Sequence, residues 1–215
     1  MLRSLIDFML FCPGKRASAM TIPFPPGAAP GVFVFETALG FFSIGWSSAG
    51  ITRCVLPEPS REAAKRRLAE RGGVAAPLVD DETALPAPVR AAVEAIRAYA
   101  EGDTTGFGAV PLDLAGIDGF RLAIYAAARA LGHGEVVTYG ELAERAGYPG
   151  MAREAGTALG RNPIPLIVPC HRIIAAGGKL GGFSARGGAN TKKRLLAHEH
   201  AAPPPANPDQ CAFAF

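Results

Sequence analysis

The stretch NPIPLIVPCHRII, from Asn162 to Ile174, carries the most distinctive chemistry in the chain. It opens with an Asn-Pro turn signal and continues as an apolar run that is too short for a core helix. Pro169 fixes one backbone dihedral and has no N–H, so we expect Cys170 on a constrained turn where bulk water is scarce. A thiol attacks only as a thiolate, and the neighbouring imidazole of His171 is able to take its proton near neutral pH. The alternative interpretation is a small buried cysteine beside a core histidine.

This motif is followed by a glycine-rich stretch and by LLAHE, from Leu195 to Glu199, where a helix could carry the glutamate inward. The combination resembles the O6-alkylguanine-DNA alkyltransferases, which are the methylated-DNA–protein-cysteine methyltransferases. The resemblance runs from about Pro111 to Glu199, a little under half of the chain. It implies an α/β protein with a small N-terminal antiparallel sheet and helices, ribonuclease-H-like, followed by a helical C-terminal DNA-binding domain like a winged helix-turn-helix.

The expected divisions of the chain are a disordered leader (1–30), an N-terminal α/β support domain (31–108), a catalytic DNA-binding domain (109–200) and a disordered tail (201–215). In the support domain, β-branched and aromatic runs at 32–37, 41–46 and 51–56 predict an antiparallel meander. Two helices should follow it, one capped by Ser60 and stopped by Gly72-Gly73, the other spanning about 88–101.

The catalytic domain is expected to be helical. Asp118 can cap a helix that reaches about 131. Thr138 and Glu141 form a T-x-x-E capping box, which predicts a short helix ending near 147. A helix rich in small residues at 151–159 would complete a helix-turn-helix, an arrangement that is only a packing motif in many proteins and binds DNA in others.

The composition excludes several classes of protein. Of the 215 residues 49% are apolar, yet no apolar run approaches the roughly 18 residues that span a membrane. The four cysteines lie far apart, with no CxxC pair and no histidine at ligand spacing, so neither a zinc site nor a disulfide framework is expected. Residues 111–200 hold eleven Lys or Arg against seven Asp or Glu, a balance of +4 that favours a polyanionic partner or a merely solvated basic face. A reducing cytoplasm suits a chain with a reactive thiol.

The resemblance implies transfer of an alkyl group from guanine O6, or from thymine O4, to Cys170, with no cofactor and no metal. A saturated carbon requires in-line displacement by a soft nucleophile, and a thiolate suits this better than a hydroxyl. In the family's arrangement His171 takes the thiol proton and Glu199 holds and charges the imidazole. The thioether product has no chemical route back, so each protein molecule should react once.

The family's target base must be rotated out of the duplex, and the matched positions supply the DNA contacts. Arg153 matches the arginine that fills the vacated stack. Tyr139 matches the tyrosine that crowds the phosphate and hydrogen-bonds the flipped base, and it belongs to the expected catalytic set. Small residues on the same helix as Arg153 would let the backbone approach the minor groove, namely Ala152, Ala155 and Gly156. The implied partner is double-stranded DNA carrying alkylated guanine, bound by a monomer without membrane contact.

The positions that match the family's base pocket are Asn162, which ties a turn, and Cys170, Ile173 and Ser184, whose backbone would read the base edge. The segment 182–188 departs from the family because it is two residues longer and has Phe183 where tyrosine is usual. The sequence therefore does not define the shape of the pocket wall or the range of alkyl groups that the pocket accepts.

Two other functions are compatible with parts of the sequence. A thiol hydrolase could use Cys170, His171 and Glu199 to form a thioester and turn over, but it would leave the helix-turn-helix and the basic balance unexplained. A non-catalytic damage-binding protein of the alkyltransferase-like kind would lack a reactive cysteine, so Cys170 argues against it.

Overall fold

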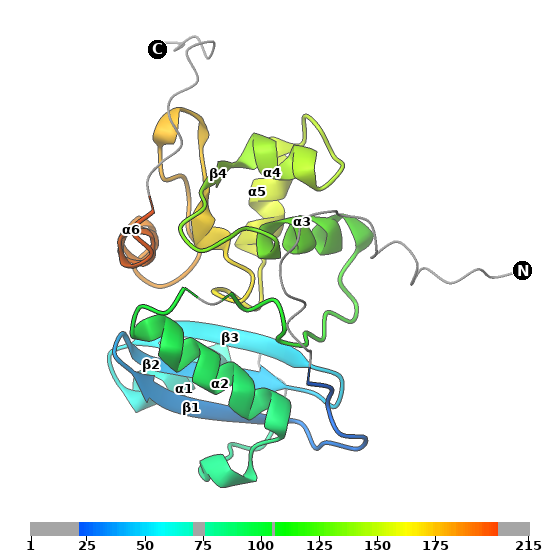
Figure 1. Ribbon diagram of the computed structural model, residues 1–215, viewed down its shortest axis with the longest axis vertical. Helices are drawn as coiled ribbons and strands as arrows, with labels where there is room; N and C mark the ends of the chain where they lie inside the picture. The colour runs from blue at the N-terminus through cyan, green and yellow to red at the C-terminus, as the bar shows by residue number, and fades with distance from the viewer. Residues whose placement is uncertain (1–21, 71–75, 105, 202–215) are drawn as a thin grey trace, which may run out of the picture.

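The computed structural model describes residues 22–70, 76–104 and 106–201, and Figure 1 shows their arrangement. The chain begins with a three-stranded antiparallel sheet of β1 (Gly31–Thr37), β2 (Gly40–Trp46) and β3 (Ile51–Glu58), in the order β1-β2-β3. The helices α1 (Arg61–Glu70) and α2 (Ala87–Ala100) pack on this sheet, with a 3-10 turn at Glu82–Ala84 between them. The predicted meander and both predicted helices are confirmed, while the predicted stop at Gly72-Gly73 lies outside the described residues.

The sheet and α2 enclose the larger of two apolar cores. Phe35 and Phe42 from the strands are at most 1% exposed and join one cluster with Val89 and Ile96 of α2. Four residues from much later in the chain complete the same cluster, namely Ile164, Leu166, Ile167 and Leu195. The backbone adds a link, because the N–H of Cys54 in β3 donates to the carbonyl of Pro163 at 3.1 Å. The apolar run that precedes Cys170 is thus buried against the N-terminal half.

Residues 106–201 hold four α-helices, α3 (Gly119–Arg129), α4 (Tyr139–Arg145), α5 (Ala152–Gly160) and α6 (Ala189–His198), and two 3-10 turns, Cys170–Arg172 and Ala176–Gly178. A parallel pair of two-residue strands, β4 (Val137–Thr138) and β5 (Ile173–Ile174), lies beside α4. Asp118 accepts a hydrogen bond from the N–H of Arg121, and both bonds of the capping box between Thr138 and Glu141 are present, as the sequence predicts. The helices α3, α4 and α5 pack on one another around the second core (Figure 1).

Two boundaries differ slightly from the predictions, since α3 ends at Arg129 rather than near 131 and α4 ends at Arg145 rather than near 147. Helix ends commonly vary by this much because the last turn is held by few hydrogen bonds. The β4–β5 pair was not predicted, because two residues are too few to show a period. None of the described helices has the length and hydropathy needed to cross a membrane.

The predicted leader and tail fall largely on residues 1–21 and 202–215, outside the described part of the chain. Residues 22–30 are described, and they touch the folded body. Phe24 packs against the larger core, and the carbonyl of Ala29 accepts a hydrogen bond from Nε1 of Trp46 at 3.0 Å.

Candidate active site

A tied turn presents the cysteine. Oδ1 of Asn162 accepts from the N–H of Ile164 at 3.0 Å, and its Nδ2 donates to the carbonyl of Val168 at 2.9 Å. Within this turn Leu166 adopts a left-handed backbone with φ of 74°, which is costly for a side chain that is also fully buried. The two side-chain hydrogen bonds of Asn162 help to offset that strain, so a residue without both a donor and an acceptor could not replace it equally.

Cys170 opens a short 3-10 turn that runs to Arg172 and follows directly from Pro169. Its N–H donates to the carbonyl of Val168 at 2.8 Å, and the residue is 7% exposed. The thiol is one of the residues that line a cavity of about 590 Å³, which lies within the usual size of ligand sites. Cys170 is therefore shielded from bulk water and still reachable from one side.

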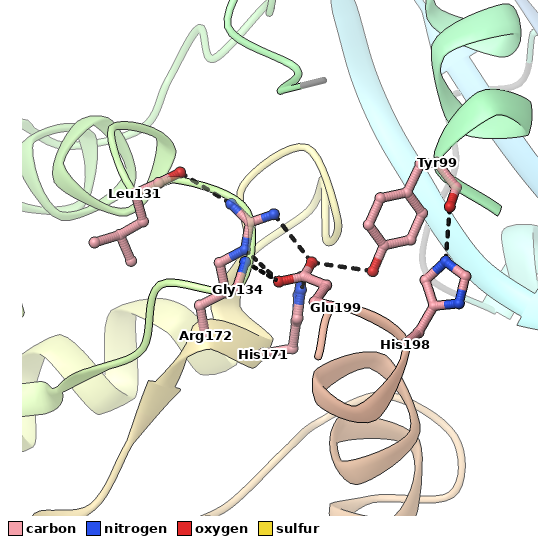
Figure 2. Close-up of polar contacts among 7 residues, drawn as sticks. All are labelled: Tyr99, Leu131, Gly134, His171, Arg172, His198 and Glu199. Atoms are coloured by element: carbon pink, nitrogen blue, oxygen red, sulfur yellow. Dashed lines mark hydrogen bonds and ion pairs between the residues drawn. The ribbon is translucent and has the colours of Figure 1, made fainter. Parts of the chain in front are cut away.

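A buried polar network lies behind the cysteine, centred on Glu199, which follows the last residue of α6 (Figure 2). Oε1 accepts from His171 Nε2 at 2.7 Å and from Arg172 Nη2 at 3.0 Å. Oε2 accepts from Arg172 Nε at 2.8 Å and from the N–H of Gly134 at 3.1 Å. Arg172 also donates to the carbonyl of Leu131 at 2.9 Å. The fork of Arg172 thus grips both carboxylate oxygens and fixes the plane of the carboxylate.

The network controls the protonation of its members. Burial alone would raise the pKa of Glu199, but hydrogen bonds and charge from His171 and Arg172 hold it well below its usual range. Burial lowers the pKa of His171, and the hydrogen bond and charge of Glu199 oppose that shift. Nε2 of His171 faces an ionised acceptor and must carry a hydrogen, which leaves Nδ1 as the acceptor of a neutral ring. Nδ1 has no hydrogen-bond partner among the described residues.

The N-terminal half contributes one residue to this network. The hydroxyl of Tyr99, in the last turn of α2, donates to Oε1 of Glu199 at 3.0 Å across 100 positions of sequence (Figure 2). The carbonyl of Tyr99 accepts from Nε2 of His198 at 2.7 Å, and the two rings lie 5.0 Å apart. Burial and the charge of Glu199 raise the pKa of Tyr99 far above its usual range, so its hydroxyl stays a donor. Tyr99 was not among the residues predicted for the site, because its place in α2, three positions after Ile96, indicates only an apolar helix face.

A second residue that the sequence analysis missed is Lys192, in the first turns of α6. Its side chain is fully buried, its ammonium donates to the carbonyl of Ile173, and it lies 5.6 Å from the centre of the Tyr139 ring. Burial lowers its pKa from the ordinary 10.5 to about 8, and the negative charge of a Cys170 thiolate opposes that shift. A positive charge at Lys192 and a thiolate at Cys170 therefore stabilise each other. No pattern distinguished this lysine from the exposed Lys193 beside it.

The cavity in front of Cys170 has two walls. Helix α5 supplies one wall through Ala152, Arg153, Gly156, Thr157, Leu159 and Gly160, and the loop after β5 supplies the other through Gly182, Phe183 and Ser184. Tyr139 of α4 lies between them, with its hydroxyl 3.4 Å from the carbonyl of Gly182. Burial, with a contribution from a Cys170 thiolate, raises the pKa of Tyr139. Arg153 is exposed at the rim.

The structure therefore brings most of the predicted site residues together, in two groups. Tyr139, Ala152, Arg153, Gly156, Phe183 and Ser184 line the cavity with Cys170, whereas Asn162, His171 and Glu199 lie behind it. Ile173 is fully buried and does not line the cavity, and its carbonyl is engaged by Lys192. Nowhere in the described part of the chain do three metal-ligating side chains gather into a possible metal site.

Known proteins resemble this chain in both sequence and structure. The sequence model described as "6-O-methylguanine DNA methyltransferase, DNA binding domain" matches residues 119–201. A methylated-DNA–protein-cysteine methyltransferase of Mycobacterium bovis is 44% identical over 119 residues, which are 55% of this chain and 70% of that protein. A protein of the same name from Methanothermobacter thermautotrophicus is 30% identical over 154 residues, 72% of this chain and 76% of that one.

Solved structures agree. The crystal structure of Mycobacterium tuberculosis OGT in complex with DNA matches with a TM-score of 0.61 and 33% identity, over 80% of this chain and 95% of that one. An O6-methylguanine-DNA methyltransferase of Pyrococcus kodakaraensis matches in fold, with a TM-score of 0.58 at 23% identity. Fold and site thus define an α/β protein with a shielded, histidine-backed cysteine beside a DNA-binding domain. Within that class, the chain belongs to the methylated-DNA–protein-cysteine methyltransferase family, as the sequence motif indicated.

Proposed function

We propose that this chain repairs DNA by direct reversal, transferring the alkyl group of O6-alkylguanine to Sγ of its own Cys170 and reacting once. The observation that carries the proposal is the position of Cys170, between an open cavity walled by α5 and the buried His171–Glu199 pair. Membership of a family whose members are named methylated-DNA–protein-cysteine methyltransferases supports it. O4-alkylthymine would undergo the same displacement.

The reaction begins with loss of the thiol proton. Neutral His171 donates through Nε2 to Glu199, so its Nδ1 is the basic atom that takes this proton, directly or through one water. The imidazolium that forms is stabilised by the carboxylate of Glu199, whose low pKa keeps it ionised. The buried ammonium of Lys192 adds a second positive charge that favours the thiolate.

The thiolate then displaces the base. Its lone pair forms the S–C bond while the C–O6 bond breaks, and the electron pair of that bond stays on the guanine. The guanine takes up one proton, which balances the proton that His171 removed from the thiol, and becomes an unmodified base. The protein is left with a thioether, which has no good leaving group at neutral pH, so His171 and Glu199 cannot regenerate the thiol.

The cavity wall suits a base that has been rotated out of the duplex. In this proposal α5 lies in the minor groove, where Ala152 and Gly156 allow close approach and Arg153 fills the space that the base leaves. Tyr139 crowds the phosphate beside the flipped nucleotide. The backbone of Ile173 and Ser184 would contact the base edge.

Several finer features belong to the same proposal. The three-stranded sheet with its helices would be ribonuclease-H-like, and α4 with α5 would form a winged helix-turn-helix. Residues 31–108 would act as a support domain and residues 109–200 as the catalytic one. The protein would act as a monomer in the cytoplasm.

Stoichiometry tests the proposal. A small amount of protein is incubated with excess duplex DNA that contains O6-methylguanine, and its mass is followed by mass spectrometry of the intact chain and of the peptide that contains Cys170. We expect one methyl group per chain, on Cys170, and a burst of repair equal to the protein added. Cys170→Ser should abolish both signals. Repair that continues past one equivalent without an added cofactor would favour the thiol hydrolase instead.

A further inference from the structure

A second buried carboxylate lies outside the network of Glu199. Glu58, the last residue of β3, is 4% exposed, and its Oε2 accepts from Nη1 of Arg186 at 2.7 Å. The two residues are 128 positions apart, and the side chain of Arg186 is 62% exposed. A carboxylate this deeply buried is rarely found without a charged partner, so the position of Arg186 matters to the sheet.

Arg186 also matters to the cavity. It follows Phe183 and Ser184, which form the wall opposite α5, by only three and two positions. Phe183 and Ala185 pack against the larger core, and the N–H of Gly188 donates to the carbonyl of Ala185 at 2.9 Å. The hydroxyl of Thr191 in α6 donates to the carbonyl of Arg186 at 2.5 Å. This end of the wall is therefore fastened both to α6 and to β3.

The other end of the same wall is held less firmly. Gly182 accepts from the hydroxyl of Tyr139 at 3.4 Å, which is long for a hydrogen bond between an O–H and a carbonyl. Gly181, next to this end, adopts a positive φ of 69°, a backbone conformation that is easy for glycine and strained for other residues. The wall thus has one fixed end, where the ion pair of Glu58 with Arg186 joins it to β3 in addition to the packing of Phe183 and Ala185 on the larger core.

We propose that the Glu58–Arg186 ion pair sets the width of the cavity and thereby the size of the alkyl group that Cys170 accepts. The inference rests on the proposed function, since it concerns the same reaction. With the pair intact, Phe183 and Ser184 stay close to α5 and favour small groups. Without the pair, the wall moves outward and bulky groups gain relative to methyl. The N-terminal sheet, which supplies none of the residues that line the cavity, would in this way help to determine specificity.

A double-mutant cycle tests this role, with Glu58→Gln, Arg186→Gln and the double variant. Single-turnover rate constants are measured on duplexes that contain O6-methylguanine or O6-benzylguanine, and the benzyl-to-methyl ratio is compared. Because Arg186 is largely exposed, we expect each single variant to raise the ratio by about threefold and the double variant to raise it no further. Lys179→Gln removes an equally positive and exposed side chain from the same loop and should leave the ratio unchanged.

The outcomes separate the two levels of the argument. If the wild-type protein fixes no alkyl group on Cys170, the proposed function itself fails. If the wild type reacts but the ratio stays constant or falls in both single variants, the specificity role is wrong. Thermal unfolding of each variant identifies loss of fold. Arg186→Lys keeps the positive charge beside Glu58, so this variant should keep most of the wild-type benzyl-to-methyl ratio.

Discussion

The network behind Cys170 and the cavity in front of it are built from opposite kinds of residue. Behind the thiol, Glu199 receives five hydrogen bonds from four residues, and Glu199, His171 and Arg172 are all at most 5% exposed. In front of it, α5 offers small side chains, and Arg153 stands exposed at the rim. Electrostatic interactions are strong where water is excluded, whereas contacts to a polyanion such as DNA require cationic side chains at the protein surface.

Under the proposed function, the buried network serves the chemistry and the residues of the cavity wall serve DNA binding. A change in the rear network should slow the reaction with every substrate, including a free alkylated base that needs no duplex. A change at the front should slow the reaction with duplex DNA and leave the free base nearly unaffected. Measuring each variant on both kinds of substrate therefore tests whether the two regions have separate roles.

The largest effect is expected for Glu199→Gln. The amide keeps the shape of the side chain but cannot stabilise an imidazolium at His171, and it leaves the buried Arg172 without a charge partner. We expect single-turnover rates to fall by about 100-fold or more on methylated duplex and on free O6-benzylguanine alike. Urea unfolding should show a loss of about 3–5 kcal/mol. Glu94→Gln changes an exposed acid on α2 and should alter neither quantity. Slowing confined to the duplex would contradict the division into front and rear.

Arg153→Ala should show the opposite selectivity. Extrusion of a base costs a few kcal/mol, and loss of the side chain that we propose fills the stack should slow the duplex reaction by about tenfold or more. The rate with free O6-benzylguanine should stay within about twofold, and binding to duplex should respond less steeply to salt than in the wild type. Arg66→Ala removes an exposed arginine from α1 as the control. Equal slowing of both substrates would refute the role of Arg153 in base flipping.

The sequence predicted the local elements because their signals are local. The β-branched and aromatic runs of β1 to β3, the cap at Asp118 and the capping box at Thr138 and Glu141 are each signalled within a few residues, and all appear in the structure. The pairing of His171 with Glu199, which lie 2.7 Å apart, was expected from the family motif alone. Their separation of 28 positions follows no periodic pattern that could predict the contact.

Other parts of the site could not be read from the sequence. Lys192 lies in the polar start of α6, which is typical of an exposed helix, and its burial depends on how α6 meets β5. Tyr99 lies in phase with Val89 and Ile96, so the pattern indicates only a core position. One signal was available, since a buried tyrosine hydroxyl usually needs a partner. Its partner is 100 positions away, and only the packing of α2 against α6 identifies it.

Lys192 lies beside the ring of Tyr139, which lines the cavity, and donates to the carbonyl of the buried Ile173. Its effect should appear in how the free energy of unfolding varies with pH. Its pKa of about 8 is below the ordinary 10.5, so the unfolded chain binds more protons between these values and the free energy of unfolding rises with pH there. In Lys192→Met this gain is absent. The difference in unfolding free energy, wild type minus variant, should therefore grow by on the order of 2 kcal/mol from pH 8 to pH 10, measured by urea unfolding. A difference that stays constant across this range would show that burial does not lower the pKa of Lys192 in the folded protein.

The smallest effect is expected for Tyr99→Phe, where the N-terminal half reaches the rear network. The hydroxyl donates to the same oxygen of Glu199 that faces His171, and it thereby withdraws negative charge from that oxygen. Arg172 and Gly134 hold the carboxylate in place without it, so phenylalanine should change the charge more than the geometry. The imidazolium of His171 then becomes more stable, and the thiol loses its proton at lower pH.

We therefore expect the midpoint of the pH–rate profile with free O6-benzylguanine to move down by about half a unit in Tyr99→Phe, with a loss of stability of about 1 kcal/mol. Tyr125→Phe is the matched control, because the hydroxyl of Tyr125 is equally buried but donates to the carbonyl of Ala158 at 2.9 Å. That variant should lose similar stability and keep the wild-type midpoint. Identical midpoints in the two variants would show that the hydroxyl of Tyr99 stabilises the fold without affecting the protonation of His171. An upward shift of the midpoint would show that the hydroxyl of Tyr99 helps Glu199 to stabilise the imidazolium of His171. Tyr99 would then belong to the buried network with an effect opposite to the one expected here.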